Sequence, residues 1–321
     1  MKKALISGCL VGVVAVIFLM RFYPPTDDFN LENPFWNGLK NFQEVTEATS
    51  VNLASEVRVT FFPAESILFI IGPSGPFGNE EVALVKSYLE AGGGLVLADD
   101  FGSGNFLLEG LGLRSRFSGK LVVDALFRGK ASCLPKTVDI SHFLANISAL
   151  LLNYPTFLEI APGEASVLAT SSAFSYVEEL ANGNMEKRPG PFPMIAEISY
   201  GKGKIYLVAD ASIFINCMLD EEDNRKLAAS FVEGKQVFID TSTYPYSRLG
   251  RLKAWQMEIY HVASRFEVRY SIFLALVLFI VGMRFKRKKI KDKENIRDIL
   301  ERHPDWNKTT LLKIKKERKD E

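Results

Sequence analysis

The centre of the chain alternates short, wholly apolar runs with longer amphipathic segments. Residues 67–71 and 95–98 are uninterrupted apolar runs, which are typical of parallel strands buried on both faces. Between them, Val82, Val85 and Leu89 recur at helical spacing. Because strand, helix and strand follow one another with short turns, the pattern predicts a parallel β-sheet covered by helices.

The helix between these two runs has start and stop signals. Asn79 is a suitable N-cap, and Glu80 and Glu81 place negative charge in the first turn, where the helix dipole favours it. Gly92 follows the last periodic residue and is expected to end the helix in a left-handed conformation. The predicted helix therefore follows Asn79 and ends at residue 91.

Weaker patterns complete the predicted fold. A polar segment at residues 177–193 is interpreted as an exposed loop, and residues 194–200 and 204–209 as a hairpin. Further strands are predicted at residues 49–57, 121–123, 149–152, 166–169 and 236–240, and further helices at residues 39–47, 105–111 and 220–231. The predicted fold class is α/β, with a doubly wound, mostly parallel sheet.

Two apolar runs lie outside this pattern, near the two ends of the chain. Residues 4–20 carry no charge, and residues 270–283 are followed by a basic cluster. Since roughly 17 to 25 apolar residues cross a bilayer as a helix, we predict two transmembrane helices, the first an uncleaved signal anchor. The alternatives are a cleaved signal peptide or lipidation at Cys9 for the first run, and a buried core helix for the second.

Charge is distributed unevenly around these runs. The 321 residues have a net charge of +1, with 47% hydrophobic and 24% charged residues, the usual mix of a globular protein. Residues 22–269 contain 21 Lys/Arg and 30 Asp/Glu, a net of −9, whereas residues 284–321 contain 15 and 8, a net of +7. By the positive-inside rule, we predict a cell-membrane protein with both termini cytoplasmic and an extracytoplasmic centre.

The predicted organisation follows from these runs. It comprises a transmembrane signal anchor at 1–21, a stalk at 22–32, an external α/β domain at 33–245, a juxtamembrane helix at 246–269, a transmembrane helix at 270–284 and a basic cytoplasmic tail at 285–321. Cys133 and Cys217 are interpreted as two buried thiols, with a disulfide between them as the alternative. The cysteines show no spacing that suggests zinc.

Polar residues follow several of the predicted strands. In open α/β sheets, ligands bind beyond the carboxyl ends of the strands, so these residues are expected to converge on one crevice if their strands are adjacent. The alternative is helix capping by Asp, Ser and Asn. The candidates for binding a ligand or partner are Asp99, Asp100, Ser103, Asn105, Asp210, Ser212 and Asp240.

Several kinds of site fit these residues poorly. Gly102-Ser103-Gly104 lacks the third glycine of a dinucleotide motif, and no phosphate-binding loop occurs. A Ser103–His142 pair stays open, but nothing beyond residue type supports it. Asp99 and Asp100 would face opposite ways on a strand, although either could join another carboxylate in acid–base or cation chemistry. We therefore expect no catalytic residues, no bound metal and no cofactor.

The segments GPSGPFGNEEVALVKSYLEAGGGLVLADDFGSGN (72–105), GKGKIYLVADASIFIN (201–216) and DNRKLAASFV (223–232) resemble the uncharacterised domain family numbered 4350. The resemblance implies a glutamine-amidotransferase-like, flavodoxin-like fold in a membrane-anchored protein. Related domains occur in auxiliary proteins of gliding-motility-type ABC transporters, and members are often encoded near MoxR-type ATPases. The chain departs from active amidotransferases because Asp99 and Asp100 stand at the expected cysteine position.

Two hypotheses of different class follow. The first is a non-enzymatic envelope protein whose external domain binds a small ligand or a protein partner within a membrane complex. The second is a hydrolase or metal-dependent enzyme that uses Asp99, Asp100 and Asp210. The basic tail is interpreted as a membrane-flanking segment that attracts anionic lipid or docks a protein, so no nucleic-acid partner is expected.

Overall fold

The computed structural model describes residues 2–56, 65–100, 102–141, 144, 146–181, 183–242, 250–252, 255–256, 259, 262, 264–291 and 296–320. The chain divides into two compact units, Met1–Lys253 and Ala254–Glu321. The predicted juxtamembrane helix at 246–269 lies partly outside the described residues, as does His142. Each unit is considered by itself.

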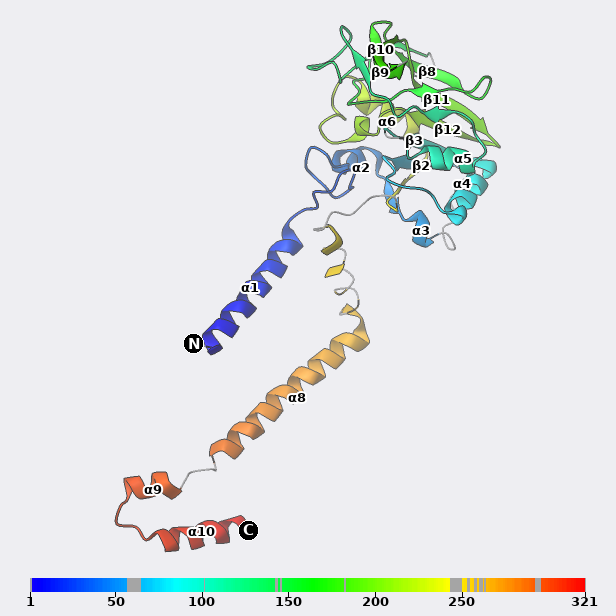
Figure 1. Ribbon diagram of the computed structural model, residues 1–321. Coiled ribbons are helices and arrows are strands. Elements are labelled where there is room, and N and C mark those ends of the chain that lie inside the picture. Colours follow the sequence, from blue (N-terminus) through cyan, green and yellow to red (C-terminus); the bar gives the residue numbers. More distant parts are fainter. Residues whose placement is uncertain are drawn as a thin grey trace. The chain divides into compact units, whose positions relative to one another are not determined.

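The described residues of the first unit build an eight-stranded sheet in the order β1-β13-β2-β3-β12-β11-β8-β6 (Figure 1). Strands β1, β13, β2, β3 and β12 run parallel to one another, whereas β11 pairs antiparallel with both β12 and β8, and β8 pairs antiparallel with β6. The strands are β1 (Thr49–Val51), β2 (Ser66–Ile71), β3 (Gly94–Ala98), β6 (Thr137–Ile140), β8 (Ser166–Ser171), β11 (Pro193–Tyr200), β12 (Gly203–Val208) and β13 (Gln236–Asp240). The predicted fold class is therefore corrected to a mixed sheet with helices.

The parallel half of the sheet forms as the apolar runs predict. Every residue of β2 and β3 is buried, and helix α4 (Asn79–Ala91) connects the two strands. Gly92 ends the helix with a φ of 115°, a conformation that glycine adopts without strain. The N-cap lies one residue before the predicted one, at Gly78 instead of Asn79. The Gly78 N–H donates a hydrogen bond to Glu81 Oε2 at 2.5 Å.

An aromatic cluster forms part of the core beside the sheet. The ring of Phe42 lies 5.1 Å from that of Phe69 and 5.3 Å from that of Phe214. Phe231 contacts both Phe69 and Tyr206. These rings come from α2 (Lys40–Thr46), β2, η2 (Ser212–Phe214), α6 (Asn224–Val232) and β12. The cluster therefore ties segments that lie far apart in the sequence to the central strands.

Two smaller sheets were not recognised from the sequence as such. Strands β5 (Val122–Asp124), β9 (Ser175–Ala181) and β10 (Asn184–Pro189) form one, and β4 (Arg116–Phe117) and β7 (Leu158–Glu159) form the other. The predicted loop at 177–193 is wrong, because β9 and β10 pair antiparallel across it. All of β10 is exposed, so the strand carries none of the apolar alternation by which a half-buried strand is recognised.

The predicted membrane spans are corrected as well. In the described part of the chain, no helix combines the length and the apolar character that crossing a membrane requires. Helix α8 (Phe266–Lys291) has an uncharged run of only 14 residues, 270–283, against about 20 for a typical span. This finding contradicts the predicted signal anchor, the second span and the cell-membrane location.

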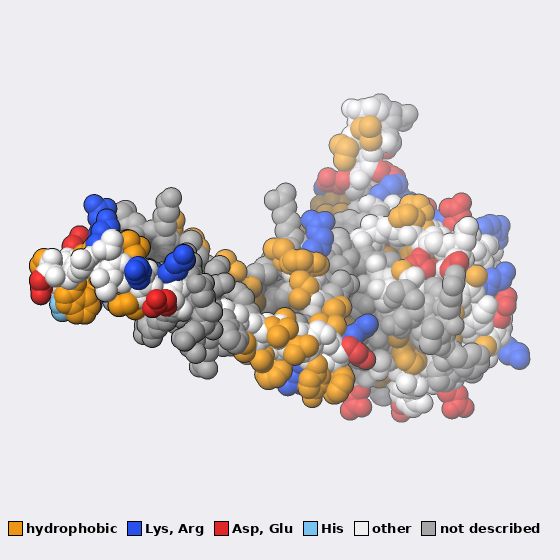
Figure 2. All heavy atoms as spheres, turned by 90° about the horizontal axis from the view of Figure 1, so that it is seen from below, with side chains coloured by type: hydrophobic (Ala, Val, Ile, Leu, Met, Phe, Trp, Pro, Cys, Tyr) orange, Lys and Arg blue, Asp and Glu red, His pale blue; other side chains and the backbone are white. Residues whose placement is uncertain are grey.

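The remaining helices are α1 (Lys2–Phe22), α3 (Leu53–Glu56), α5 (Asn105–Gly110), α9 (Ile296–Arg302) and α10 (Lys308–Asp320). In the second unit, exposed apolar side chains lie among basic and acidic ones (Figure 2). The rings of His303 and Trp306 stack 4.5 Å apart between α9 and α10.

The three cysteines are free; Cys217 is exposed and Cys133 half-buried, so neither the disulfide nor the pair of buried thiols forms.

Candidate functional site

The sheet register brings three of the predicted aspartates to neighbouring strand ends. Strands β3 and β12 are adjacent and parallel, with Ala98 paired to Val208. Asp99 and Asp100 follow the first strand and Asp210 follows the second, after one further residue. The charges of Asp100 and Asp210 interact. These carboxyl groups therefore meet at the edge of the sheet where ligands of open α/β folds bind.

The carboxylate of Asp99 is hydrogen-bonded within a turn. Its side chain is fully buried, and Oδ2 accepts a hydrogen bond of 2.6 Å from the Gly104 N–H. Gly102 in the same turn has a φ of 85°, which favours glycine. Gly104, and not Asp99, is the N-cap of α5, and the Asp99 carboxylate stabilises the turn that precedes this helix.

Asp100 is turned toward the segment that follows β12. Its Oδ1 accepts a hydrogen bond from the Ala211 N–H, and the Ser212 hydroxyl is a second partner. Burial raises the pKa of Asp100 to about 7; the nearby charge of Asp99 adds to the rise, and the Ala211 and Ser212 hydrogen bonds oppose it. Asp100 therefore lies close to half-protonated at neutral pH.

Asp210 is enclosed by the fold. It is fully buried, and Oδ2 accepts a hydrogen bond of 2.6 Å from the Asn153 N–H. Oδ1 has no hydrogen-bond partner, although the N–H groups of Ser212 and Ile213 lie near enough to favour the ionised form. Burial and then the charge of Asp100 raise the pKa of Asp210 well above its ordinary value.

A crevice of about 520 Å³ lies at these strand ends. It is lined by three parts of the chain: residues 26–29, residues 72–74, and a group made of Asp100, Ser103 and Ala211. The ring of Phe29 covers Gly72 so closely that a β-carbon there would lie 2.8 Å from the ring. Asp27, Asp28 and Asp100 make the lining acidic, and none of the described lining residues is basic.

The wall at residues 26–29 is held by asparagine side chains. Asn33 is fully buried, and its Nδ2 donates to the Asp27 carbonyl oxygen at 2.8 Å. Asn37 Nδ2 donates to the Thr26 carbonyl oxygen at 3.2 Å and also to the Asp28 carboxylate. A segment interpreted from its sequence as part of a stalk thus contributes to the crevice. The closely spaced Asn and Asp residues are the sequence signal for such local hydrogen bonding.

The other predicted site residues divide between the crevice and the framework. Ser103 lines the crevice, and Ser212 supports Asp100 without lining it. Asn105 bridges two segments, donating to the Phe117 carbonyl oxygen at 2.9 Å and accepting from its N–H at 2.8 Å. Asp240 lies outside the crevice.

Asp240 has structural partners of its own. Its Oδ1 accepts hydrogen bonds from the N–H groups of Leu53 and Ser242, at 3.3 and 2.9 Å. Burial raises its pKa. The carboxylate therefore ties the end of β13 to the segment that follows the neighbouring strand β1, and it does not join the Asp100–Asp210 pair.

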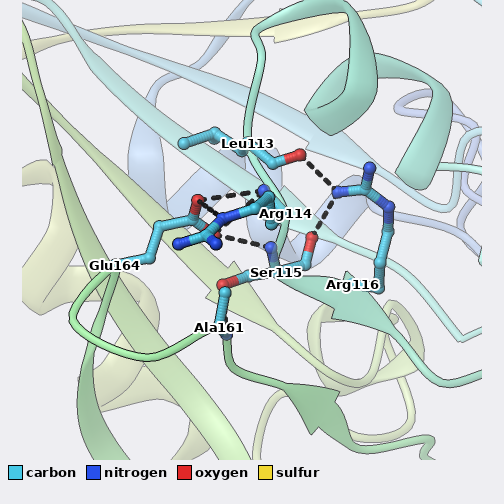
Figure 3. Close-up of polar contacts among 6 residues, drawn as sticks. All are labelled: Leu113, Arg114, Ser115, Arg116, Ala161 and Glu164. Carbon is cyan, nitrogen blue, oxygen red and sulfur yellow. Dashed lines mark hydrogen bonds and ion pairs between the residues drawn. The ribbon is translucent and has the colours of Figure 1, made fainter.

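Sequence reasoning missed a clasp centred on Glu164 (Figure 3). Its carboxylate accepts hydrogen bonds from the N–H groups of Arg114 and Ser115, the latter at 2.6 Å. Burial raises the pKa of Glu164, but the hydrogen bonds from Ser115 and Arg114 outweigh this effect and lower the pKa below its ordinary value. Arg116 Nη1 donates to the carbonyl oxygens of Leu113 and Ser115. Because both side chains bind main-chain groups, we interpret the clasp as a structural feature.

The arrangement limits the chemistry that the crevice can perform. Of the strand-end carboxylates only Asp100 lines it, since Asp99 is bound to Gly104 and Asp210 is enclosed. Within the described part of the chain, no three Asp, Glu, His or Cys residues are grouped so as to hold a metal ion. The Ser103–His142 hypothesis involves a histidine outside the described residues. Of the three strand-end carboxyl groups, the geometry therefore leaves only that of Asp100 in contact with the crevice.

Comparisons with solved structures give partial likenesses. The N-terminal domain of mmIFT52 is 18% identical over 52% of this chain and 75% of that chain, with a TM-score of 0.42. A β-galactosidase from Bacillus circulans sp. alkalophilus is 15% identical over 53% of this chain, with a TM-score of 0.33, and the match spans 23% of the galactosidase. Cytoplasmic protein STM3548 from Salmonella typhimurium is 13% identical over 60% and 78% of the two chains, with a TM-score of 0.33.

No curated protein sequence matches the chain at a significant level. The pattern of one family, described as "Domain of unknown function (DUF4350)", matches residues 32–232, which include Asp99, Asp100, Asp210 and every strand of the eight-stranded sheet except β13. The predicted resemblance to family 4350 is confirmed, while its amidotransferase-like and membrane-anchored parts are unsupported. The chain belongs to the DUF4350 family.

Proposed function

We propose that this protein is a non-enzymatic binding protein, whose strand-end crevice takes a small ligand or a side chain of a protein partner. The observation that carries the proposal is that the three strand-end aspartates have different environments. Asp99 and Asp210 have their carboxylates engaged inside the fold, while Asp100 alone lines the crevice. One carboxylate in a preformed acidic crevice can recognise a ligand.

A protein complex is the setting that we propose for this binding. A MoxR-type ATPase system or a transporter is the kind of partner that the family resemblance suggests. The crevice is wide enough, at about 520 Å³, to accept an amino-acid side chain or a small molecule, since ligand pockets commonly measure about 300 to 1,000 Å³.

The alternative is a hydrolase that uses strand-end carboxylates. One observation favours it, namely the pKa of Asp100 at about 7, which suits a general acid or base. Hydrolysis also needs a second group that reaches the substrate. The partners that this hypothesis names, Asp99 and Asp210, do not line the crevice, whereas Asp27 and Asp28 do. We place binding ahead of turnover because the named pair of strand-end carboxyl groups does not meet in the crevice.

Site-specific photo-cross-linking tests the proposal. A benzophenone amino acid replaces Ser103 on the crevice, or Ser199 as the control, in the full chain expressed in its own cells. Ser199 is exposed and pairs with Lys204, at the start of β12 and so at the far edge of the sheet. We expect a defined adduct from position 103 alone, and loss of that adduct when Asp100→Asn is added.

Two results would count against the proposal. The same adducts from positions 103 and 199 would show that contact is nonspecific. Steady turnover of a captured small molecule, abolished by Asp100→Asn, would establish the hydrolase alternative instead.

A further inference from the structure

The lining of the crevice indicates the charge of its ligand. Asp27, Asp28 and Asp100 contribute three carboxyl groups, while Phe29 and Pro73 contribute apolar surface. None of the described lining residues is Lys, Arg or His. A concave, one-signed surface concentrates ions of the opposite sign, so it repels anionic ligands and attracts cations.

The carboxyl groups of Asp100 and Asp210 influence each other's protonation. Asp100 and Asp210 follow adjacent parallel strands, both are at least nine-tenths buried, and their charges interact. Burial raises the pKa of Asp210 well above its ordinary value, because it outweighs the opposing effect of the N–H groups of Asn153, Ser212 and Ile213. Two neighbouring buried carboxylates cannot both ionise readily. Without a bound cation, we therefore expect the two groups together to retain a proton near neutral pH.

We propose that the crevice binds an ammonium or guanidinium group, and that binding releases the proton held by the Asp100–Asp210 pair. This inference rests on the proposed function, because it names the ligand class of the same crevice. The bond that breaks is the carboxyl O–H of the pair, and the proton leaves to the buffer. The ligand cation takes its place as the compensating positive charge, so the net charge of the site is conserved.

The surrounding groups support this exchange. Asp99 precedes Asp100 at the end of β3, Asp210 follows β12, and Asp27 and Asp28 line the same crevice. The charge of Asp99 disfavours ionisation of Asp100, and the charge of Asp100 disfavours ionisation of Asp210. A bound cation instead favours the ionised form of Asp100. The pKa of Asp100 at about 7 places the exchange within the physiological range.

The consequence is a binding affinity that depends on pH. A lysine side chain keeps its charge between pH 6 and 8, so Asp100 dominates the change in that interval. We expect binding about tenfold weaker at pH 6 than at pH 8, with a plateau above pH 8. About one proton per bound cation should be released at pH 6 and almost none at pH 8.5.

Calorimetric titration of the full chain provides the test, with three probes of matched size. They are Nα-acetyl-lysine methylamide, its Nε-acetylated neutral counterpart and Nα-acetyl-glutamate methylamide. Titrations at pH 6, 7 and 8 in two buffers of different protonation enthalpy count the protons released. We expect only the lysine probe to bind, with the pH profile described above.

Two variants locate the effect. Asp100→Asn should weaken binding of the lysine probe at pH 8 at least tenfold and abolish its pH dependence. Asp240→Asn is the matched control, because Asp240 is equally buried at the same end of the sheet but lies outside the crevice; its binding should equal that of the wild type. If Asp100→Asn fails to fold, the pH profile of the wild type and the comparison with the Nε-acetylated probe still decide whether the crevice binds a cation with release of a proton.

Different failures have different meanings. Preference for the neutral or anionic probe, sensitive to Asp100→Asn, would overturn the cationic class and leave the binding function standing. Lysine-probe binding without proton release would overturn the exchange. Absence of binding by any probe, combined with an adduct from position 103, would reject this inference alone; absence of both would reject the proposed function as well.

Discussion

The buried side-chain amide of Asn33 donates a hydrogen bond of 2.8 Å to the main-chain oxygen of Asp27. Through this bond, the body of the domain holds the chain segment that forms one wall of the crevice. Asn33 Oδ1 also accepts the Phe35 N–H at 2.8 Å, so the amide joins two sides of one turn. The integrity of the wall thus depends on a residue that does not line the crevice.

Replacing Asn33 with Leu should destabilise the first unit and loosen the wall. The change leaves buried main-chain groups without partners, which costs about 1–3 kcal/mol. Urea unfolding monitored by tryptophan fluorescence measures the loss. Asn184→Leu, on the exposed strand β10, is the control and should change stability little. Equal stability of the two variants would show that Asn33 does not hold the wall.

Asp100 should make the protein less stable as the pH rises. Its pKa is raised from 3.8 to about 7 in the folded state, so the folded state binds the proton more tightly than the unfolded state. The stabilisation is complete below about pH 4 and is lost as the pH rises through 7, with a slope of up to about 1.4 kcal/mol per pH unit. Chemical denaturation of wild type and Asp100→Asn between pH 4 and 8 checks this; parallel curves would contradict it.

Glu164 should show the opposite sign. Its pKa is lowered in the folded state by hydrogen bonds from Ser115 and Arg114, which outweigh burial. Its contribution is therefore present above the unfolded pKa and is lost as the pH falls through the folded value. Glu164→Gln should cost about 1–3 kcal/mol at pH 7, and less below pH 4. A loss that is independent of pH would show that the charge of Glu164 is not what stabilises the clasp.

Gly92 should not tolerate a β-branched residue. Its φ of 115° lies where only glycine is unstrained, so Gly92→Val is expected to cost about 1–3 kcal/mol. Gly75→Ala is the control, because a β-carbon at that position meets nothing within 4 Å. Thermal unfolding of both variants provides the comparison. An unchanged melting temperature for Gly92→Val would mean that the backbone at this helix end relaxes freely.

The purified chain is expected to show no glutaminase activity. Amidotransfer needs an activated nucleophile, and the turn after β3 presents Asp99 and Asp100 in place of a cysteine. Ammonia release from glutamine is the measurement, with Asp100→Asn as the comparison. Steady hydrolysis by the wild type that the variant lacks would overturn both this prediction and the binding function.

Local features of the sequence were sufficient for the strand–helix–strand unit from β2 to β3. A short continuous apolar run bounded by turn residues indicates a strand buried on both faces, the helical spacing of Val85 and Leu89 marks one buried face, and Gly92 is favoured where φ is positive. Each of these signals acts within a few residues. They needed no knowledge of the rest of the chain.

Tertiary structure decided the parts that depend on distant segments. The insertion of β12 beside β3 brings Asp210 to Asp100 across more than 100 residues of sequence, and residues 26–29 complete the crevice from the other side. The exposed strand β10 escaped notice because its pairing with β9 involves backbone groups that every residue carries. The sequence by itself determined the strands and the helix from β2 to β3, since backbone preference and apolar spacing are local. Which carboxyl group is enclosed and which faces the crevice was decided by the tertiary structure, since burial and charge interactions depend on what packs around each group.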